Sequence, residues 1–213
     1  LPRSYGADWR DGDGNITIDS EGYRKGLELY KTLYDAGATP KDSLSYEYAE
    51  TNAAFASGQV ATALQWNAAA AELTDPEKTP AVADVTGVVA PPAGPEGRAD
   101  HIHGLGLNKN AANKEGALKF LQWLATEDAA LLYAENGGSP ALMPDVVAKI
   151  ADERPDLVDL GNFASQYGYV MDGGTSAYAL SIYEVQAREF TGYWSGQQSL
   201  DEALANTKAE MEK

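Results

Sequence analysis

Cysteine is absent from the 213 residues of the chain. Its absence excludes a disulfide framework and any chemistry that needs a thiol. Long apolar runs are absent too, and a membrane-spanning helix needs about 20 consecutive apolar residues. We therefore expect no disulfide bonds and no direct insertion into a membrane.

Basic residues are scarce. Lysine and arginine together number 16 against 32 aspartates and glutamates, which gives a net charge of −16. Binding to nucleic-acid phosphates needs clustered lysine and arginine, so the sequence predicts no nucleic-acid partner. An acidic balance of this kind is typical of a highly soluble surface.

Signatures of catalysis and of metal binding are also missing. The two histidines, His101 and His103, would share one face of a strand, but two ligands do not complete a metal site. Ser139 does not lie in the turn that exposes a hydrolase nucleophile. Carboxylates are plentiful enough for a glycosidase pair, yet none lies in an apolar stretch that would raise its pKa. The sequence predicts a protein that is not an enzyme and has neither a metal nor another cofactor.

The clearest local pattern runs through residues 101–140. A glycine-rich run at 103–107 predicts a short apolar strand, and Asn110 and Asn113 are candidate caps for the helix that follows. A second helix is expected over 128–135, ending at Asn136, Gly137 and Gly138. In the first helix the 3.6-residue period predicts a buried stripe formed by Ala117, Leu118, Leu121, Leu124 and Ala125.

Elsewhere the same periodicities predict further helices, strands and irregular segments. Strands are expected at 16–18, 60–66 and 82–89, and irregular structure at 90–100 and 151–174. Helices are expected after Ser20 as far as Gly37, at 47–57, at 144–150, from Tyr178 past Val185, and at 200–211 behind a Ser199–Glu202 capping box.

Aromatic and amide residues lie where these predicted elements end. A site for an uncharged, hydroxyl-rich molecule needs aromatic faces for its C–H groups and polar groups for its hydroxyls. Ordinary packing is the alternative interpretation for each residue. The candidate ligand-binding residues are Tyr5, Trp9, Trp66, Asn67, His103, Gly137, Gly138 and Tyr178.

Several segments, in order, resemble bacterial extracellular solute-binding proteins of family 1, the sugar-binding components of ABC importers. The resemblance covers nearly all of the chain. It is carried by residues 55–61 (FASGQVA), 104–107 (GLGL), 115–124 (EGALKFLQWL), 137–140 (GGSP) and 196–204 (GQQSLDEAL).

The resemblance implies an α/β fold, periplasmic-binding-protein-like (type II), with a mixed sheet flanked by helices. Family members are about twice as long and have two lobes. Residues 1–90 and 139–213 would then form parts of the C-terminal lobe, and 91–138 a crossover segment that packs with the N-terminal lobe. The first half of the parent protein would be absent, so this fragment is expected to bind solute weakly or not at all.

The resemblance also implies a function. The parent would capture a sugar or polyol in the cleft between its lobes and deliver it to the permease subunits of an ABC transporter. It would work in the periplasm or outside the cell, with a lipid anchor in the missing N-terminus as one option. His103 holds the place of an aromatic that stacks on sugar in similar proteins, while Ala141 and Leu142 follow the GGSP turn where an arginine is frequent.

Two alternatives stay open at this point. The same fold could bind another small solute, such as a metal chelate or a polyamine, and a polyamine would need carboxylates such as Asp8 and Asp172 near the aromatics. From a different class, a carbohydrate-processing enzyme would need two opposed carboxylates about 5–10 Å apart.

Overall fold

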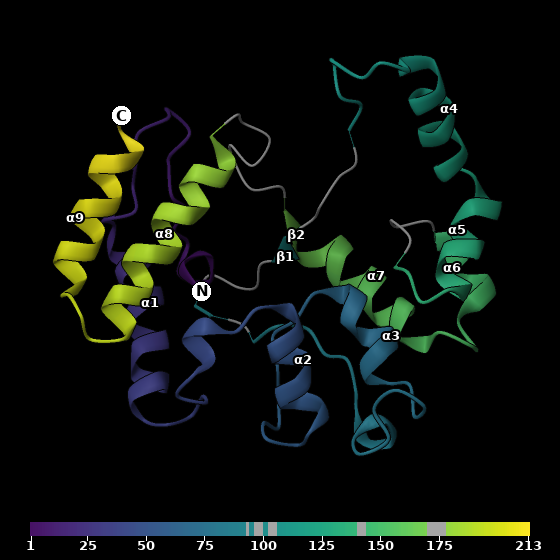
Figure 1. The fold of residues 1–213 in the computed structure, drawn as a ribbon, viewed down its shortest axis with the longest axis horizontal. Helices are drawn as coiled ribbons and strands as arrows, with labels where there is room; N and C mark the ends of the chain where they lie inside the picture. The colour runs from purple at the N-terminus through teal and green to yellow at the C-terminus, as the bar shows by residue number, and fades with distance from the viewer. Residues whose placement is uncertain (93, 96–99, 102–105, 140–143, 170–177) are drawn as a thin grey trace. The chain divides into compact units, whose positions relative to one another are not determined.

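The computed structural model describes residues 1–92, 94–95, 100–101, 106–139, 144–169 and 178–213. These residues form mainly helices (Figure 1). Contacts divide the chain into two compact units, each built from segments that are separate in the sequence. Unit 1 comprises Leu1–Glu47, Pro91–Ala99 and Val170–Lys213, and unit 2 comprises Tyr48–Ala90 and Asp100–Tyr169.

Unit 1 is a packing of three long helices: α1 (Glu21–Asp35), α8 (Ala179–Trp194) and α9 (Leu200–Met211) (Figure 1). The first and last of them confirm the predicted helices that follow Ser20 and Ser199. The core between these helices and the N-terminal segment consists of Ala7, Trp9, Ile18, Tyr23, Leu27, Phe190, Ala203 and Leu204.

The N-terminal 3-10 helix η1 (Pro2–Tyr5) lies unusually close to α1. Two glycines one helical turn apart make this approach possible. A β-carbon on Gly22 would lie 2.5 Å from the Tyr5 carbonyl oxygen, and one on Gly26 would lie 2.6 Å from the Pro2 nitrogen. Any larger residue at either position would push the two helices apart.

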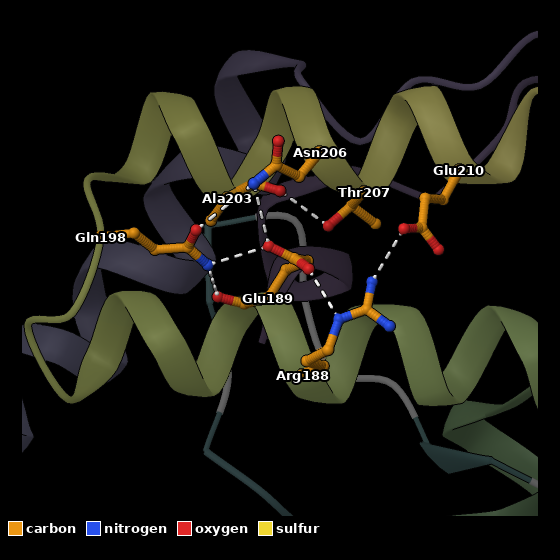
Figure 2. A network of polar contacts seen from close by, with 7 residues as sticks. All are labelled: Arg188, Glu189, Gln198, Ala203, Asn206, Thr207 and Glu210. Atoms are coloured by element: carbon orange, nitrogen blue, oxygen red, sulfur yellow. Dashed lines mark hydrogen bonds and ion pairs between the residues drawn. The ribbon is translucent and has the colours of Figure 1, made fainter.

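A polar network joins α8 to α9 (Figure 2). The Glu189 carboxylate, in a residue only 8% exposed, accepts hydrogen bonds from Arg188 Nε at 2.8 Å, Gln198 Nε2 at 3.0 Å and Asn206 Nδ2 at 3.1 Å. Arg188 also pairs with Glu210 at 3.2 Å. The bond from Arg188 is the main reason that the pKa of Glu189 lies below its ordinary value.

The start of α9 has the predicted capping box. Ser199 Oγ accepts from the Glu202 backbone N–H at 3.2 Å, and Glu202 Oε2 accepts from the Ser199 backbone N–H at 2.9 Å. Two backbone donors that the first turn leaves unpaired are satisfied in this way, which fixes where the helix begins.

Unit 2 is built from shorter helices and one parallel strand pair. The strands β1 (Asp100–His101) and β2 (Gly168–Tyr169) pair residue for residue in parallel. The core contains Ala70, Ala134, Ile150, Leu157 and Leu160. The helices are α2 (Tyr48–Ala56), α3 (Ala70–Leu73), α4 (Lys114–Leu124), α5 (Glu127–Glu135), α6 (Pro144–Ile150) and α7 (Pro155–Tyr167).

Most helix boundaries in unit 2 confirm the sequence predictions, and α2, α5 and α6 match to within one residue. Asn113 is the N-cap of α4, with its side-chain oxygen accepting from the Gly116 N–H at 2.8 Å. The prediction of irregular structure over 151–174 is wrong for α7. Pro155 starts that helix, and Leu157 and Leu160 bury one face of it.

The predicted strands at 60–66 and 82–89 are wrong. Residues 60–66 have no regular structure, and 82–89 contains only the 3-10 turn η4 (Ala83–Val85). Leu64 is 69% exposed and Val89 81% exposed. A strand needs a neighbour to accept its hydrogen bonds, and the described part of the chain supplies none for either segment.

Three other expectations differ from the structure. The predicted strand at 16–18 is reduced to a single antiparallel bridge between Arg10 and Ile16. Of the predicted strand at 103–107, residues 103–105 lie outside the described residues and 106–107 are irregular. The apolar stripe of α4 is not buried, since none of its residues is fully covered and Leu118 is 47% exposed.

Among the described residues, none of the helices combines the length and the apolar character needed to cross a bilayer.

Candidate functional site

Trp66 forms an exposed aromatic platform in unit 2. It precedes the short 3-10 helix η3 (Asn67–Ala69) in an extended conformation, and it is 67% exposed. Its ring lies beside the ring of Tyr48 at the start of α2, with centroids 5.5 Å apart and planes at 34°. The two rings are tilted against each other, and the exposed part of the Trp66 ring offers aromatic surface of the kind that stacks on the C–H face of a sugar ring.

The side chain of Gln65 fixes this platform in place. Its amide nitrogen donates to the Tyr48 carbonyl oxygen at 3.1 Å and to Asn52 Oδ1 at 2.8 Å. Its amide oxygen accepts from the Trp66 backbone N–H at 2.9 Å. The buried Asn52 side chain in turn donates to Glu72 Oε2 at 3.3 Å. One amide therefore ties the Trp66 segment to α2, so the ring is positioned before any ligand arrives.

The neighbouring residue Asn67 is half-buried and begins η3. Its carbonyl oxygen accepts from the Ala70 N–H where η3 passes into α3. Trp66 and Asn67 are thus adjacent at the start of a helical segment, and the prediction that they end a strand is wrong. Their role in ligand binding stays a prediction.

Gly137 and Gly138 are predicted ligand-binding residues, and a glycine can contact a ligand only through its backbone, but their backbone N–H groups are already bonded. The Gly137 N–H donates to the Ala134 carbonyl at 3.1 Å, and the Gly138 N–H donates to the Tyr133 carbonyl at 2.8 Å. This pair of bonds is the Schellman motif, which satisfies the last carbonyls of α5 and uses Gly137 at a φ of 84°. Both donors are occupied by the helix end.

Arg154 also binds the end of α5. Its guanidinium donates to the Ala134 carbonyl at 2.7 Å and to the Gly138 carbonyl at 3.3 Å. Asp156 holds the same guanidinium through two bonds of 2.9 and 2.8 Å, and both side chains are largely buried. The turn that follows α5 is therefore a rigid structural element.

The candidates in unit 1 have different environments. Tyr5 is half-buried and lines an open depression of about 420 Å³ together with Glu21, Lys25 and Pro95. Tyr178 precedes α8 and is 73% exposed. Trp9 is only 6% exposed within the core, and the Arg10 guanidinium lies 4.9 Å from its ring centroid. This burial favours a packing role for Trp9 over contact with a ligand.

Some candidate positions lie outside the described residues, namely His103, Asp172 and the Ala141–Leu142 pair. Asp8 is described, and it pairs with Arg3 and accepts from the Trp9 backbone N–H at 2.8 Å. A carboxylate engaged in this way is poorly placed to bind a polyamine.

Two further observations concern metal ligands and acid–base groups among the described residues. Within the described ranges no three side chains of the histidine, aspartate or glutamate type gather as metal ligands. A general acid needs a raised pKa. Hydrogen bonds instead lower the carboxyl pKa values of Asp11, Asp19, Glu21, Asp75, Glu189 and Glu202.

Comparison with known sequences gives a family match. Residues 3–131 match the model of the bacterial extracellular solute-binding protein family. A binding protein of Brucella abortus (strain 2308) is 30% identical over 139 residues, which are 63% of this chain and 33% of the relative. Iron uptake protein A1 of Synechocystis sp. is 40% identical over 67 residues, 30% of this chain and 18% of that protein. The chain spans about a third of the length of the Brucella relative.

Comparison with solved structures confirms the predicted α/β, type II periplasmic-binding-protein-like fold. A T. maritima protein solved with maltose gives a TM-score of 0.81 at 24% identity, covering 99% of this chain and 55% of its own. A solute-binding protein of Agrobacterium radiobacter K84 in complex with ribitol gives 0.73 at 20% identity, covering 98% and 53%. With more than half of its length matched by the family model, the chain belongs to the bacterial extracellular solute-binding protein family.

Proposed function

We propose that this chain forms part of the sugar- or polyol-binding component of an ABC importer. The observation that carries the proposal is the Trp66–Tyr48 platform, which is exposed and fixed by Gln65. Similar folds solved with maltose and with ribitol support a hydroxyl-rich solute. The protein would act in the periplasm or outside the cell, where this family works.

In this proposal the ring of Trp66 stacks on the C–H face of the solute, and Asn67 hydrogen-bonds a hydroxyl group. The partner wall would come from the other lobe, because the family resemblance implies that residues 1–90 and 139–213 form parts of one lobe and 91–138 the crossover. Closure of the lobes about a hinge is favoured when the solute makes better contacts in the closed state. The closed form is then presented to the permease subunits, and no cofactor or bond cleavage is required.

A titration of this chain and of its longer parent tests the proposal. Calorimetry with maltose, ribitol, spermidine and ferric citrate compares solute classes, and ferric citrate is included because a relative is named as an iron uptake protein. We expect the parent to bind a sugar or polyol and this chain to bind it at least about tenfold more weakly, a loss of about 1.4 kcal/mol. Equal affinities of the chain and its parent would refute the expectation that this chain carries only part of the binding cleft.

Two variants of the parent show whether the platform is the contact surface. Trp66→Ala should weaken sugar or polyol binding by about tenfold or more, while Leu64→Ala, at a position of similar exposure two residues earlier, should leave it unchanged. Unchanged binding in Trp66→Ala would rule out the platform. Binding of spermidine or ferric citrate alone would rule out a sugar or polyol as the solute.

A further inference from the structure

We infer that Asn52 is a positioning residue of the proposed site, because it holds both ends of the segment that carries Trp66 and Asn67. Asn52 lies on α2 and is only 5% exposed. It acts on the solute through Trp66 and does not touch the solute itself. The inference rests on the proposed function and adds to it a residue that lies beneath the binding surface.

Asn52 bonds both ends of residues 65–72. At the start of this segment its Oδ1 accepts from Gln65 Nε2 at 2.8 Å, and at the end its Nδ2 donates to Glu72 Oε2 at 3.3 Å. The segment between them carries the exposed ring of Trp66 and the turn η3. A loop tied at both ends to one buried side chain has fewer conformations, so less entropy is lost when a solute binds to it.

The direction of each bond in this chain of amides is set by its neighbours. A carboxylate can only accept, so Asn52 must present its NH2 group to Glu72 and its oxygen to Gln65. Gln65 must then present its own NH2 group, whose second hydrogen goes to the Tyr48 carbonyl at 3.1 Å. The oxygen of Gln65 is left for the Trp66 backbone N–H at 2.9 Å. Position 52 therefore needs a group that both donates and accepts.

The far end of the segment is anchored in the core of unit 2. The buried residues around Glu72 are Ala69, Ala70 and Leu73. α3 is therefore a fixed point, and the bond from Asn52 ties this fixed point to α2. Because Asn52 is buried, loss of either of its partners would leave an unsatisfied amide group away from water.

An exchange of donor and acceptor groups at constant shape tests the inference in the longer parent. Asn52→Asp removes the NH2 group and sets two carboxylates against each other, so the tie between α2 and α3 is lost. We expect this variant to bind maltose or ribitol about tenfold more weakly than the wild type. Glu72→Gln is the matched control and should leave the affinity unchanged, because its amide oxygen can still accept from Asn52.

The double variant Asn52→Asp with Glu72→Gln gives the decisive comparison. Its amide at position 72 can donate to the carboxylate at position 52, which still accepts from Gln65. We expect the affinity to return to within about threefold of the wild type. A side chain that merely filled space would show neither the loss nor the rescue, since all these variants have nearly the same shape. Undiminished binding by Asn52→Asp, or no recovery in the double variant, would overturn the inference.

Hydrogen exchange on the chain alone makes the test independent of the solute. After correction for intrinsic rates, the Trp66 N–H should exchange at least about tenfold more slowly than the Leu64 N–H, which makes no bond within the described ranges. Asn52→Asp should remove this protection, and the double variant should restore it. Equal exchange of the two groups in the wild type would also overturn the inference, even if the variants do not fold.

The two readouts separate this inference from the proposed function. If Trp66→Ala leaves sugar or polyol binding unchanged, the proposed function fails. Loss and recovery of the Trp66 N–H protection in the same set of Asn52 variants would then still show that Asn52 holds the segment in place. If Trp66→Ala abolishes binding while Asn52→Asp changes neither binding nor exchange, the proposed function stands and the role of Asn52 is refuted.

Discussion

Gly137 and Gly161 show how differently two glycines can be used within one unit. Gly137 has a φ of 84° at the end of α5, a conformation that costs a residue with a β-carbon about 1–2 kcal/mol. Gly161 lies inside α7, where a β-carbon would meet nothing within 4 Å. The first glycine is required by the backbone, and the second only weakens its helix.

Alanine substitutions at these positions should therefore have opposite effects. We expect Gly137→Ala to lower the free energy of unfolding by about 1–2 kcal/mol and Gly161→Ala to raise it by about 0.5–1 kcal/mol. Urea denaturation followed by circular dichroism measures both. A destabilising Gly161→Ala would show that the interior of α7 is more crowded than described.

At the site, the sequence predicted the exposed Trp66 but missed the residues that hold it. Tyr48 and Asn52 lie four residues apart on α2, which was a signal that they share a face. Gln65 could not be identified, because its bonds to Tyr48 and Asn52 span 17 and 13 residues of chain. Such bonds depend on how the chain folds back, which local periodicity does not encode.

Among the elements, α5 is unusual in how completely its C-terminal end is bound. The Schellman bonds and the Arg154 guanidinium together cover the carbonyls of Tyr133, Ala134 and Gly138. A buried cation that donates to carbonyls and is neutralised by Asp156 cannot be removed without leaving unpaired groups.

We expect Arg154→Ala to destabilise the protein by about 2–3 kcal/mol, because charge-assisted hydrogen bonds are lost and the Asp156 carboxylate remains buried. Lys119→Ala is the matched control, since it removes an exposed ion pair worth under about 1 kcal/mol. Chemical denaturation of both variants gives the comparison. Similar losses of unfolding free energy in the two variants would mean that the bonds from Arg154 to the end of α5 do not stabilise the fold.

The α8–α9 hairpin should be sensitive to acid through Glu189. Its pKa is lowered from an ordinary value of 4.5, chiefly by the bond from Arg188. A group with a lowered folded pKa stabilises the fold above its unfolded pKa, and this contribution is lost as the pH falls through the folded value. Stability should thus decline below about pH 4.5.

Glu189→Gln should flatten that part of the stability–pH profile, as measured by thermal unfolding between pH 3 and pH 6. Glu184→Gln makes the same change of net charge on the exposed side of α8 and serves as the control. If Glu189→Gln leaves the acid-side slope as steep as in the wild type, the Glu189 network is not the source of the effect.

Helices were predicted better than strands, and the reason is physical. A helix closes its hydrogen bonds within one segment, so the Ser199–Glu202 box and the glycines after α5 were sufficient to place its ends. A strand depends on a distant neighbour. The segments at 60–66 and 82–89 have strand-like composition, but the described residues provide no sheet for them. α7 was missed because its sequence is rich in residues that also occur in loops.

For the whole molecule, the net charge of −16 is a property that no single contact reveals. Like charges repel most strongly in the compact state and at low ionic strength. Raising the salt concentration from about 0.01 to 0.1 M shortens the screening length from about 30 to 10 Å. The same ions also weaken the exposed ion pairs, but acidic residues outnumber basic ones by two to one.

We therefore expect sodium chloride over that range to raise the melting temperature by about 2–4 °C, which corresponds to about 1 kcal/mol for a chain of this size. Differential scanning calorimetry at fixed pH measures the shift, with glycine at equal osmolality as the uncharged control. A lower melting temperature in salt would mean that ion pairs dominate over net repulsion.

The interleaving of the two units along the chain limits how the protein can be dissected. The chain passes between units after Glu47, Ala90, Ala99 and Tyr169, so neither unit is one continuous stretch of sequence. A shortened gene that stops after Glu47 would encode only part of unit 1, and one that stops after Ala90 or Ala99 would encode incomplete portions of both units. A gene that stops after Tyr169 would complete unit 2 but would leave unit 1 without its last segment. To obtain either unit in isolation, its separate segments would have to be spliced together by new loops, and a single protease nick at one passage would leave three covalent connections intact.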